Sequence, residues 1–215
     1  MQIIKISQEN LEKILKIAER VTKGGGVVIC PTDTVYGLIA DAKNGEVVKK
    51  VFKIKKRNFK KPIPIFVKDL KMAKNLAFID KIQEKFLKKV WPGKVTVVLK
   101  ARYTKFPKGI LSQDKKIGLR IPNYKLLNNL LKKLNFPLAE TSANISGRPP
   151  STKIKEVLKQ FKCKNSQLIY PDLILDAGNL KPSLPSTVVD LERFKILREG
   201  EFSKRKILRI LKTIK

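Results

Sequence analysis

Short apolar runs alternate with amphipathic stretches along the whole chain. Between residues 11 and 21, apolar side chains recur every three or four positions, which predicts a helix. Ser7 or Asn10 precedes this stretch as a possible N-cap, and Gly24 begins a three-glycine run that ends it. The following run of four, "VVIC", is too short for a helix and predicts a buried strand that Pro31 ends.

The same two patterns continue to the end of the sequence. Strands are expected over residues 2–6, 27–30, 63–67, 95–100, 117–121, 137–141, 173–176, 186–191 and 194–198. Further helices are expected over 46–56, 69–76, 80–90, 124–134, 153–160 and 203–215. Alternating strands and helices predict an α/β fold with an open, twisted, mixed sheet, and the last cluster of strands suggests antiparallel pairing at one side. No repeat, linker or composition break divides residues 1–215, so a single domain is expected.

Composition limits the cellular setting. No uninterrupted apolar run reaches membrane-spanning length, and the first ten residues do not resemble a secretory signal, so a cytoplasmic protein without membrane association is expected. Cys30 and Cys163 are the only cysteines, and there is no histidine, which argues against a structural zinc site. Both cysteines are expected to be buried, reduced thiols.

The formal net charge is +30, from 48 basic and 18 acidic residues. Such a field favours anionic partners such as nucleotides or nucleic acid. Only nine of the basic residues are arginine, and the lysines are spread over every predicted helix. Charge alone therefore does not separate an RNA-binding module from a basic enzyme.

Three clusters of hydroxyl and amide side chains fall at predicted strand boundaries, where α/β sheets bind ligands. They are "PTDTVYG" with Thr34, "SANISG" with Ser142 and Asn144, and "AGNLKPSLPST" with Ser186. Each alone is better explained as turn or cap chemistry, as for Ser151. Three such clusters in one domain favour a ligand site.

Basic residues at strand ends add counter-charges. Lys55, Arg57 and Lys61 surround the entrance to the strand at 63–67, and arginine's planar fork suits phosphate. Arg120 lies inside an apolar strand, where a charge needs a partner, and Arg198 ends another strand. No P-loop or dinucleotide-binding glycine motif is present, so a bound nucleotide would rest on side chains and scattered backbone donors. Without histidine, the hydroxyls lack their usual activating base.

These segments resemble the YrdC-like threonylcarbamoyl-AMP synthase family. The matching segments are "GGGVVICPTDTVYGL", "KKRNFKKPI", "WPGKVTVVL", "GLRIP", "PLAETSANISGRP", "PSTVVDL" and "ILREG". The resemblance extends from about residue 10 to 203, to a short form without the extra C-terminal domain of longer relatives. It implies an open twisted α/β sheet around a large positive cavity.

The implied activity forms threonylcarbamoyl-AMP and pyrophosphate from L-threonine, bicarbonate (or CO2) and ATP with Mg2+. A downstream transferase would then modify the tRNA adenosine beside the anticodon. The substrate's own carbamate is the nucleophile, so no catalytic side chain is expected beyond electrostatic support from Lys55 and Arg57, and no protein metal motif is visible. The resemblance places Lys55, Arg57, Lys61, Lys116, Ser142, Asn144 and Arg198 at ATP. It places Thr34, Phe66, Arg120, Glu140 and Ser186 at threonine.

Four residues depart from the family pattern. Asn58 and Lys94 stand where proline is usual, Phe66 replaces a histidine that faces threonine, and Glu140 replaces a small residue. Two other functions remain open. An RNA-binding module would bind tRNA or double-stranded RNA with steep salt dependence and no turnover. A relative using carbamoyl phosphate would need the extra domains and zinc motifs that this chain lacks.

Overall fold

The computed structural model describes residues 1–161 and 169–214. The strands there are β1 (Gln2–Lys5), β2 (Val28–Cys30), β3 (Gly37–Asp41), β4 (Ile65–Phe66), β5 (Val95–Lys100), β6 (Lys116–Arg120), β7 (Leu138–Ser142), β8 (Leu173–Asp176), β9 (Thr187–Asp190) and β10 (Lys195–Arg198). The helices are α1 (Leu11–Lys23), α2 (Gly45–Lys55), α3 (Leu70–Leu76), α4 (Lys81–Val90), α5 (Lys125–Leu134), α6 (Ile154–Phe161) and α7 (Lys204–Ile214).

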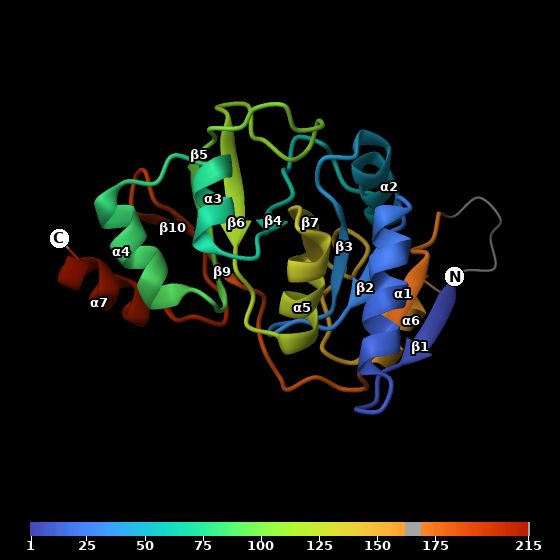
Figure 1. Cartoon of the computed structure of the whole chain (residues 1–215). Coiled ribbons are helices and arrows are strands. Elements are labelled where there is room, and N and C mark those ends of the chain that lie inside the picture. Colours follow the sequence, from blue (N-terminus) through green and yellow to red (C-terminus); the bar gives the residue numbers. More distant parts are fainter. Residues whose placement is uncertain (162–168, 215) are drawn as a thin grey trace.

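All these strands join in one mixed sheet in the order β1-β8-β2-β3-β7-β4-β6-β5-β9-β10. The sheet contains both parallel pairs, such as β5 with β9, and antiparallel pairs, such as β3 with β7. Along the chain, β1, β2 and β3 belong to one half of the sheet, and β7 and β8 add to that same half much later in the sequence. Both halves therefore contain segments that are far apart in sequence (Figure 1). The α/β fold class with a mixed sheet is confirmed.

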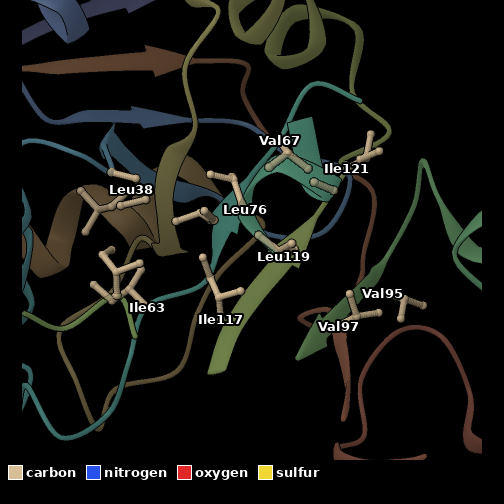
Figure 2. Packing of buried hydrophobic residues seen from close by; sticks show 14 of the residues in the cluster. Leu38, Ile63, Val67, Leu76, Val95, Val97, Ile117, Leu119 and Ile121 are labelled. Carbon is tan, nitrogen blue, oxygen red and sulfur yellow. The ribbon is translucent and has the colours of Figure 1, made fainter. Parts of the chain in front are cut away.

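The two faces of the sheet are covered unequally. A larger apolar cluster lies on one face, where β4 and β6 contribute Ile65 and Leu119 and helices α2, α3, α4, α6 and α7 pack along the full width. Figure 2 shows part of this cluster, with Ile117 and Leu119 of β6 near Leu76 of α3. A smaller cluster lies on the other face, where, among the described helices, α1 and α5 pack side by side and cover the sheet (Figure 1).

Helix boundaries follow local chemistry. The side chain of Asn44 accepts hydrogen bonds from the Glu46 and Val47 amides at the start of α2, and Asp80 with Gln83 forms a capping box on α4. The expected cap of α1 is different. Asn10 holds the N-cap position, but its side chain accepts from the Ser7 amide and donates to the Lys5 carbonyl instead of capping the helix.

Three expectations about strands were wrong. The strand Gly37–Asp41 was not predicted, because "GLIAD" directly follows a turn-rich cluster, yet it is buried inside the sheet between β2 and β7. The strand expected over 63–67 shrinks to Ile65–Phe66, since Pro64 donates no backbone hydrogen bond. The last three strands do not cluster: β9 and β10 pair antiparallel at one edge, whereas β8 lies between β1 and β2.

No helix among the described residues is long and apolar enough to cross a membrane. Cys30 is a buried free thiol, and burial raises its pKa. Cys163, expected to be a second buried thiol, lies outside the described residues.

Candidate active site

The uncovered part of the sheet forms the floor of a cavity of about 380 Å³. Alternation along β5, β6 and β9 turns one set of side chains into the apolar core and the other set toward this cavity. The cavity-facing set consists of Thr96, Val98, Lys116, Gly118, Val188 and Asp190. Gly118 leaves room for the chain that enters β4, because a Cβ there would lie 2.9 Å from the Cβ of Pro64. The volume is within the range of about 300–1,000 Å³ typical of small-molecule sites.

A second cavity of about 100 Å³ lies where the cover of α1 and α5 ends. It shares Arg57, Pro64 and Arg198 with the larger cavity. Its wall contains Thr34, Val35, Arg57, Pro64, Arg120, Glu140, Thr141, Ser142, Pro185, Ser186 and Arg198. The three polar clusters singled out in the sequence therefore meet in one place, with one hydroxyl from each.

Arg120 lies at the end of β6 with its side chain 2% exposed. Its Nη2 donates to Asp33 Oδ1 at 2.5 Å, its Nε to the Gly93 carbonyl at 2.8 Å and its Nη1 to Thr34 Oγ1 at 3.5 Å. The guanidinium also lies over the ring of Phe66, 5.5 Å from its centroid. Three of five N–H groups are engaged, so two are left for an anionic ligand at the cavity.

Asp33 is the partner that a charge in an apolar strand requires. Its second oxygen, Oδ2, is buried without a hydrogen bond partner. Sequence reasoning did not assign this residue a role. The available signal was that Asp33 is the sole acidic residue in the turn "PTDTVYG".

The turn after β2 is held by its own hydroxyls. Thr32 Oγ1 donates to the Val35 carbonyl at 2.7 Å and accepts from the Thr34 amide at 3.0 Å. Since the Thr32 proton is thus used, the 3.0 Å contact between the two hydroxyls places the Thr34 proton toward Thr32. Thr34 consequently offers an acceptor, not a proton, to the rest of the site.

Lys55 supports the loop after β7. Its Nζ donates to the carbonyls of Ser142 and Asn144 at 2.6 and 2.8 Å and to Asn144 Oδ1 at 3.1 Å. Burial, together with repulsion from Arg57, lowers the pKa of Lys55 to about 7. All three ammonium protons bond within the protein, so Lys55 positions this loop and has no free donor for a phosphate.

Asn144 is equally occupied. Its Oδ1 accepts from Ser142 Oγ at 2.5 Å, and its Nδ2 donates to the carbonyls of Ile145 and Arg148. Ser142 lines the smaller cavity, whereas Asn144 is buried behind it. The loop is therefore a preformed wall.

Between Lys55 and Arg57 the backbone turns sharply. Lys56 ends α2 in the left-handed conformation, with φ 51° and ψ 43°. Because of this turn, Lys55 points to the β7 loop while Arg57 reaches both cavities. Arg57 is fixed by donating to the carbonyls of Lys61 and Pro62, at 2.8 and 3.0 Å.

The opposite wall comes from the C-terminal part of the chain. Arg198 donates from Nη2 to the Ser186 carbonyl at 2.7 Å and to Ser186 Oγ at 3.2 Å. Ser186 Oγ also contacts Thr96 Oγ1 at 2.9 Å. Burial lowers the pKa of Arg198 and of Arg57, so two desolvated guanidiniums face the space shared by the two cavities.

Two residues expected at ATP differ from Arg57 and Arg198 in their surroundings. Lys116 lines the larger cavity, but its Nζ contacts Glu192 at 2.7 Å and Asp190 at 2.9 Å, and these contacts raise its pKa. Lys61 is exposed and does not line either cavity.

Of the residues expected at threonine, Phe66 differs from the others. It is fully buried in the α1–α5 cluster and supports Arg120 from behind without lining the cavity. Glu140 does line it, 9% exposed, and burial raises the pKa of its carboxyl.

A search against family models places residues 20–200 in the Sua5/YciO/YrdC group, whose description is "Telomere recombination". The chain belongs to the Sua5/YciO/YrdC family. A Methanocaldococcus jannaschii protein named provisionally as a threonylcarbamoyl-AMP synthase is 35% identical, over 97% of this chain and 96% of its own. The Pyrococcus abyssi threonylcarbamoyl-AMP synthase is 30% identical over 99% of this chain, which spans only 62% of that protein.

Solved structures of Sua5/YciO/YrdC proteins share the fold. The crystal structure of Pyrococcus abyssi Sua5 with L-threonine superposes with a TM-score of 0.86 at 30% identity, over 97% of this chain and 60% of that one. A Methanobacterium thermoautotrophicum protein solved in solution gives 0.65 at 34% identity, covering 89% and 88%. Escherichia coli YciO, at 24% identity and 0.78, supports the fold alone.

Proposed function

We propose that this protein is a threonylcarbamoyl-AMP synthase, a nucleotidyltransferase that converts L-threonine, bicarbonate or CO2, and ATP into threonylcarbamoyl-AMP and pyrophosphate. The observation that carries the proposal is the meeting of Thr34, Arg57, Arg120, Ser142 and Arg198 around one small cavity that continues into a larger one. The relatives' names and the threonine bound to Pyrococcus abyssi Sua5 support the same activity.

The two cavities suit two anionic substrates. Arg120, with two free N–H groups beside the Thr34 hydroxyl, would bind the threonine carboxylate in the smaller cavity. Arg57 and Arg198, where the cavities join, would neutralise the α-phosphate and the departing pyrophosphate. Ser142, whose proton bonds to Asn144, would accept a hydrogen bond at the adenylate, and Ser186 would donate or accept one.

Chemistry of this kind needs no protein nucleophile. The amine of threonine adds to CO2, and an oxygen of the resulting carbamate attacks the α-phosphorus while the bond to pyrophosphate breaks. The protein holds both partners within reach, supplies positive charge and excludes water from a labile mixed anhydride. Preformed hydrogen bonds around Lys55, Arg57 and Arg120 keep these groups fixed before substrates arrive.

Mg2+ would enter with the triphosphate. Among residues 1–161 and 169–214 no cluster of three acidic or thiol side chains could hold a metal ion. The carboxylate of Asp190 in the larger cavity bonds to Lys116. The metal ion would then be held mainly by the phosphate oxygens of ATP.

The product would pass to a transferase that modifies tRNA. Direct contact with tRNA is a further part of the proposal, since a net charge of +30 favours polyanions.

A pyrophosphate-release assay tests the function. Release should require threonine and bicarbonate together, with AMP appearing only as hydrolysed product. Equal release without threonine would refute the synthase, and salt-sensitive RNA binding with no turnover would favour the RNA-binding module.

A further inference from the structure

Glu140 is the acidic side chain in the wall of the smaller cavity. It is 9% exposed, and its carboxylate has no hydrogen bond or ion pair within the described part of the chain. Burying a carboxylate without a partner costs free energy, so an unpaired one inside a cavity requires an explanation.

Its orientation follows from the strand. Along β7 the side chains alternate, and Glu140 shares a side with Ser142, which also lines the cavity. The neighbouring strand makes room at Gly37, where a Cβ would lie 3.4 Å from Glu140 Oε1 and 3.3 Å from Thr32 Cγ2. The absence of a side chain at Gly37 therefore leaves space for the Glu140 carboxylate on this side of the sheet.

The other carboxylate nearby behaves differently. Asp33 accepts a hydrogen bond from Arg120 and neutralises the charge of that guanidinium. Glu140 is left as an available negative charge beside a guanidinium that keeps two free N–H groups. This pairing of charges is complementary to a free amino acid, which carries one carboxylate and one ammonium group.

We propose that Glu140 is a catalytic residue that binds the ammonium of the amino-acid substrate and accepts one of its protons. This role rests on the proposed synthase function. The amine needs its lone pair to attack CO2. One N–H proton passes to the Glu140 carboxylate, the C–N bond forms as one carbon–oxygen π bond of CO2 opens, and a second proton leaves nitrogen for solvent. The carbamate results with no oxidant or reductant.

The electrostatic surroundings support a proton acceptor. Burial is the largest influence on Glu140 and raises its pKa, which strengthens it as a base. Charged and titratable groups facing it come from five places: Lys55 at the end of α2, Arg57 after it, Arg120 on β6, Arg198 on β10, and Asp33 with Cys30 at β2. The nearby cations oppose this rise, since their positive charge favours the ionised carboxylate.

The test is the pH dependence of Glu140→Gln. Threonine-dependent pyrophosphate release is measured from pH 6.5 to 8.5 at limiting threonine and saturating ATP, with dissolved CO2 fixed and carbonic anhydrase present. The wild type should lack a tenfold rise per pH unit, because Glu140 takes the proton from bound ammonium. Any change caused by titration of Lys55, whose pKa is about 7, should be shared by the wild type and the variant. The variant must capture free amine, so its kcat/KM should rise about tenfold per pH unit below the amine pKa.

Three comparisons make the result specific. Glu140→Asp keeps a carboxylate and should restore the wild-type pH profile at reduced rate, so it also tests the proposal if the glutamine variant folds poorly. Asp33→Asn removes a charge next to Arg120 and should not introduce the slope. The KM for ATP should be unchanged in Glu140→Gln.

The proposed synthase function and the proposed role of Glu140 can be refuted separately. An inactive, folded wild type would remove the synthase function and this role with it. An active wild type together with a Glu140→Gln variant of unchanged pH profile, or with a change confined to the KM for ATP, would overturn only the role of Glu140, leaving it as a counter-charge to the arginines.

Discussion

One face of the sheet is built in two ways. Over β2, β3 and β8 it carries Val28, Ile39 and Leu173 against α1 and α5, and over β5, β6 and β9 the same face carries Thr96, Lys116 and Asp190 with no helix above it. Helix cover decides the difference, since a covered face must be apolar and an uncovered one can keep charges hydrated. Arg120 lies at the border, with Phe66 on one side and the cavity on the other.

This contrast shows which part of such a fold can carry polar functional groups without loss of stability. The covered half and the fully covered opposite face supply stability, while the open half supplies polar groups at little packing cost. Substitutions that separate stability from activity test the contrast, starting with the border itself.

Asp33→Ala should cause the largest loss. It leaves the buried Arg120 guanidinium without its carboxylate, and breaking a buried pair in this way costs about 3–5 kcal/mol of unfolding free energy. Urea denaturation measures the loss. The double variant Asp33→Leu/Arg120→Met should be more stable than Asp33→Ala, and a double variant that is less stable would contradict the assignment of the pair.

Leu119→Ala and Val98→Ala compare the two faces directly, on neighbouring strands. Leu119 is fully buried in the helix-covered core, so its truncation should cost about 2–5 kcal/mol of unfolding free energy. Val98 lines the open cavity, so its truncation should cost about 1 kcal/mol or less of unfolding free energy. Equal losses in thermal or urea unfolding would show that the cavity face is packed in solution.

Arg57→Ala should reduce activity much more than it reduces stability. Its guanidinium bonds only to backbone carbonyls of Lys61 and Pro62 and faces both cavities. Loss of a charge-assisted phosphate contact should raise the activation free energy by about 2 kcal/mol or more, with a much smaller change in stability. Pyrophosphate release gives the first quantity and urea unfolding the second. Near-normal kcat and KM for ATP would exclude Arg57 from the nucleotide site.

Of these substitutions, Glu140→Gln should change the free energy of unfolding least, and it should increase it. Burial raises the pKa of Glu140, so between the unfolded and folded values the native state binds more protons, and wild-type stability falls as pH rises through that window. The variant lacks this fall and should be the more stable protein at pH 7, with the difference disappearing toward pH 4. Thermal midpoints of both proteins over this range decide it.

Sequence patterns were sufficient for the helices, whose boundaries depend on local caps such as Asn44 and Asp80. They were insufficient wherever position depends on distant segments. The Gly37–Asp41 strand is defined by its partners β2 and β7, and β8 joins β1 across more than 160 residues of chain, so neither follows from a local window.

The sequence was likewise informative about some features of the candidate site and not about others. The residue types of Thr34, Arg57 and Ser142 marked segments that the structure brings together around the smaller cavity. Their partners were not visible: the tie from Lys55 to the β7 loop and the pair between Arg120 and Asp33 join residues about 87 positions apart.

The left-handed turn at Lys56 gives the middle position of the Lys-x-Arg motif a constraint of its own. With φ at 51°, a β-branched side chain there would be strained, whereas glycine or asparagine would fit at least as well as lysine. Related sequences should therefore avoid valine and isoleucine between the two basic residues, even though the side chain at that position is exposed. Replacing Lys56 by valine would rotate the two flanking cations away from their separate tasks without removing either one.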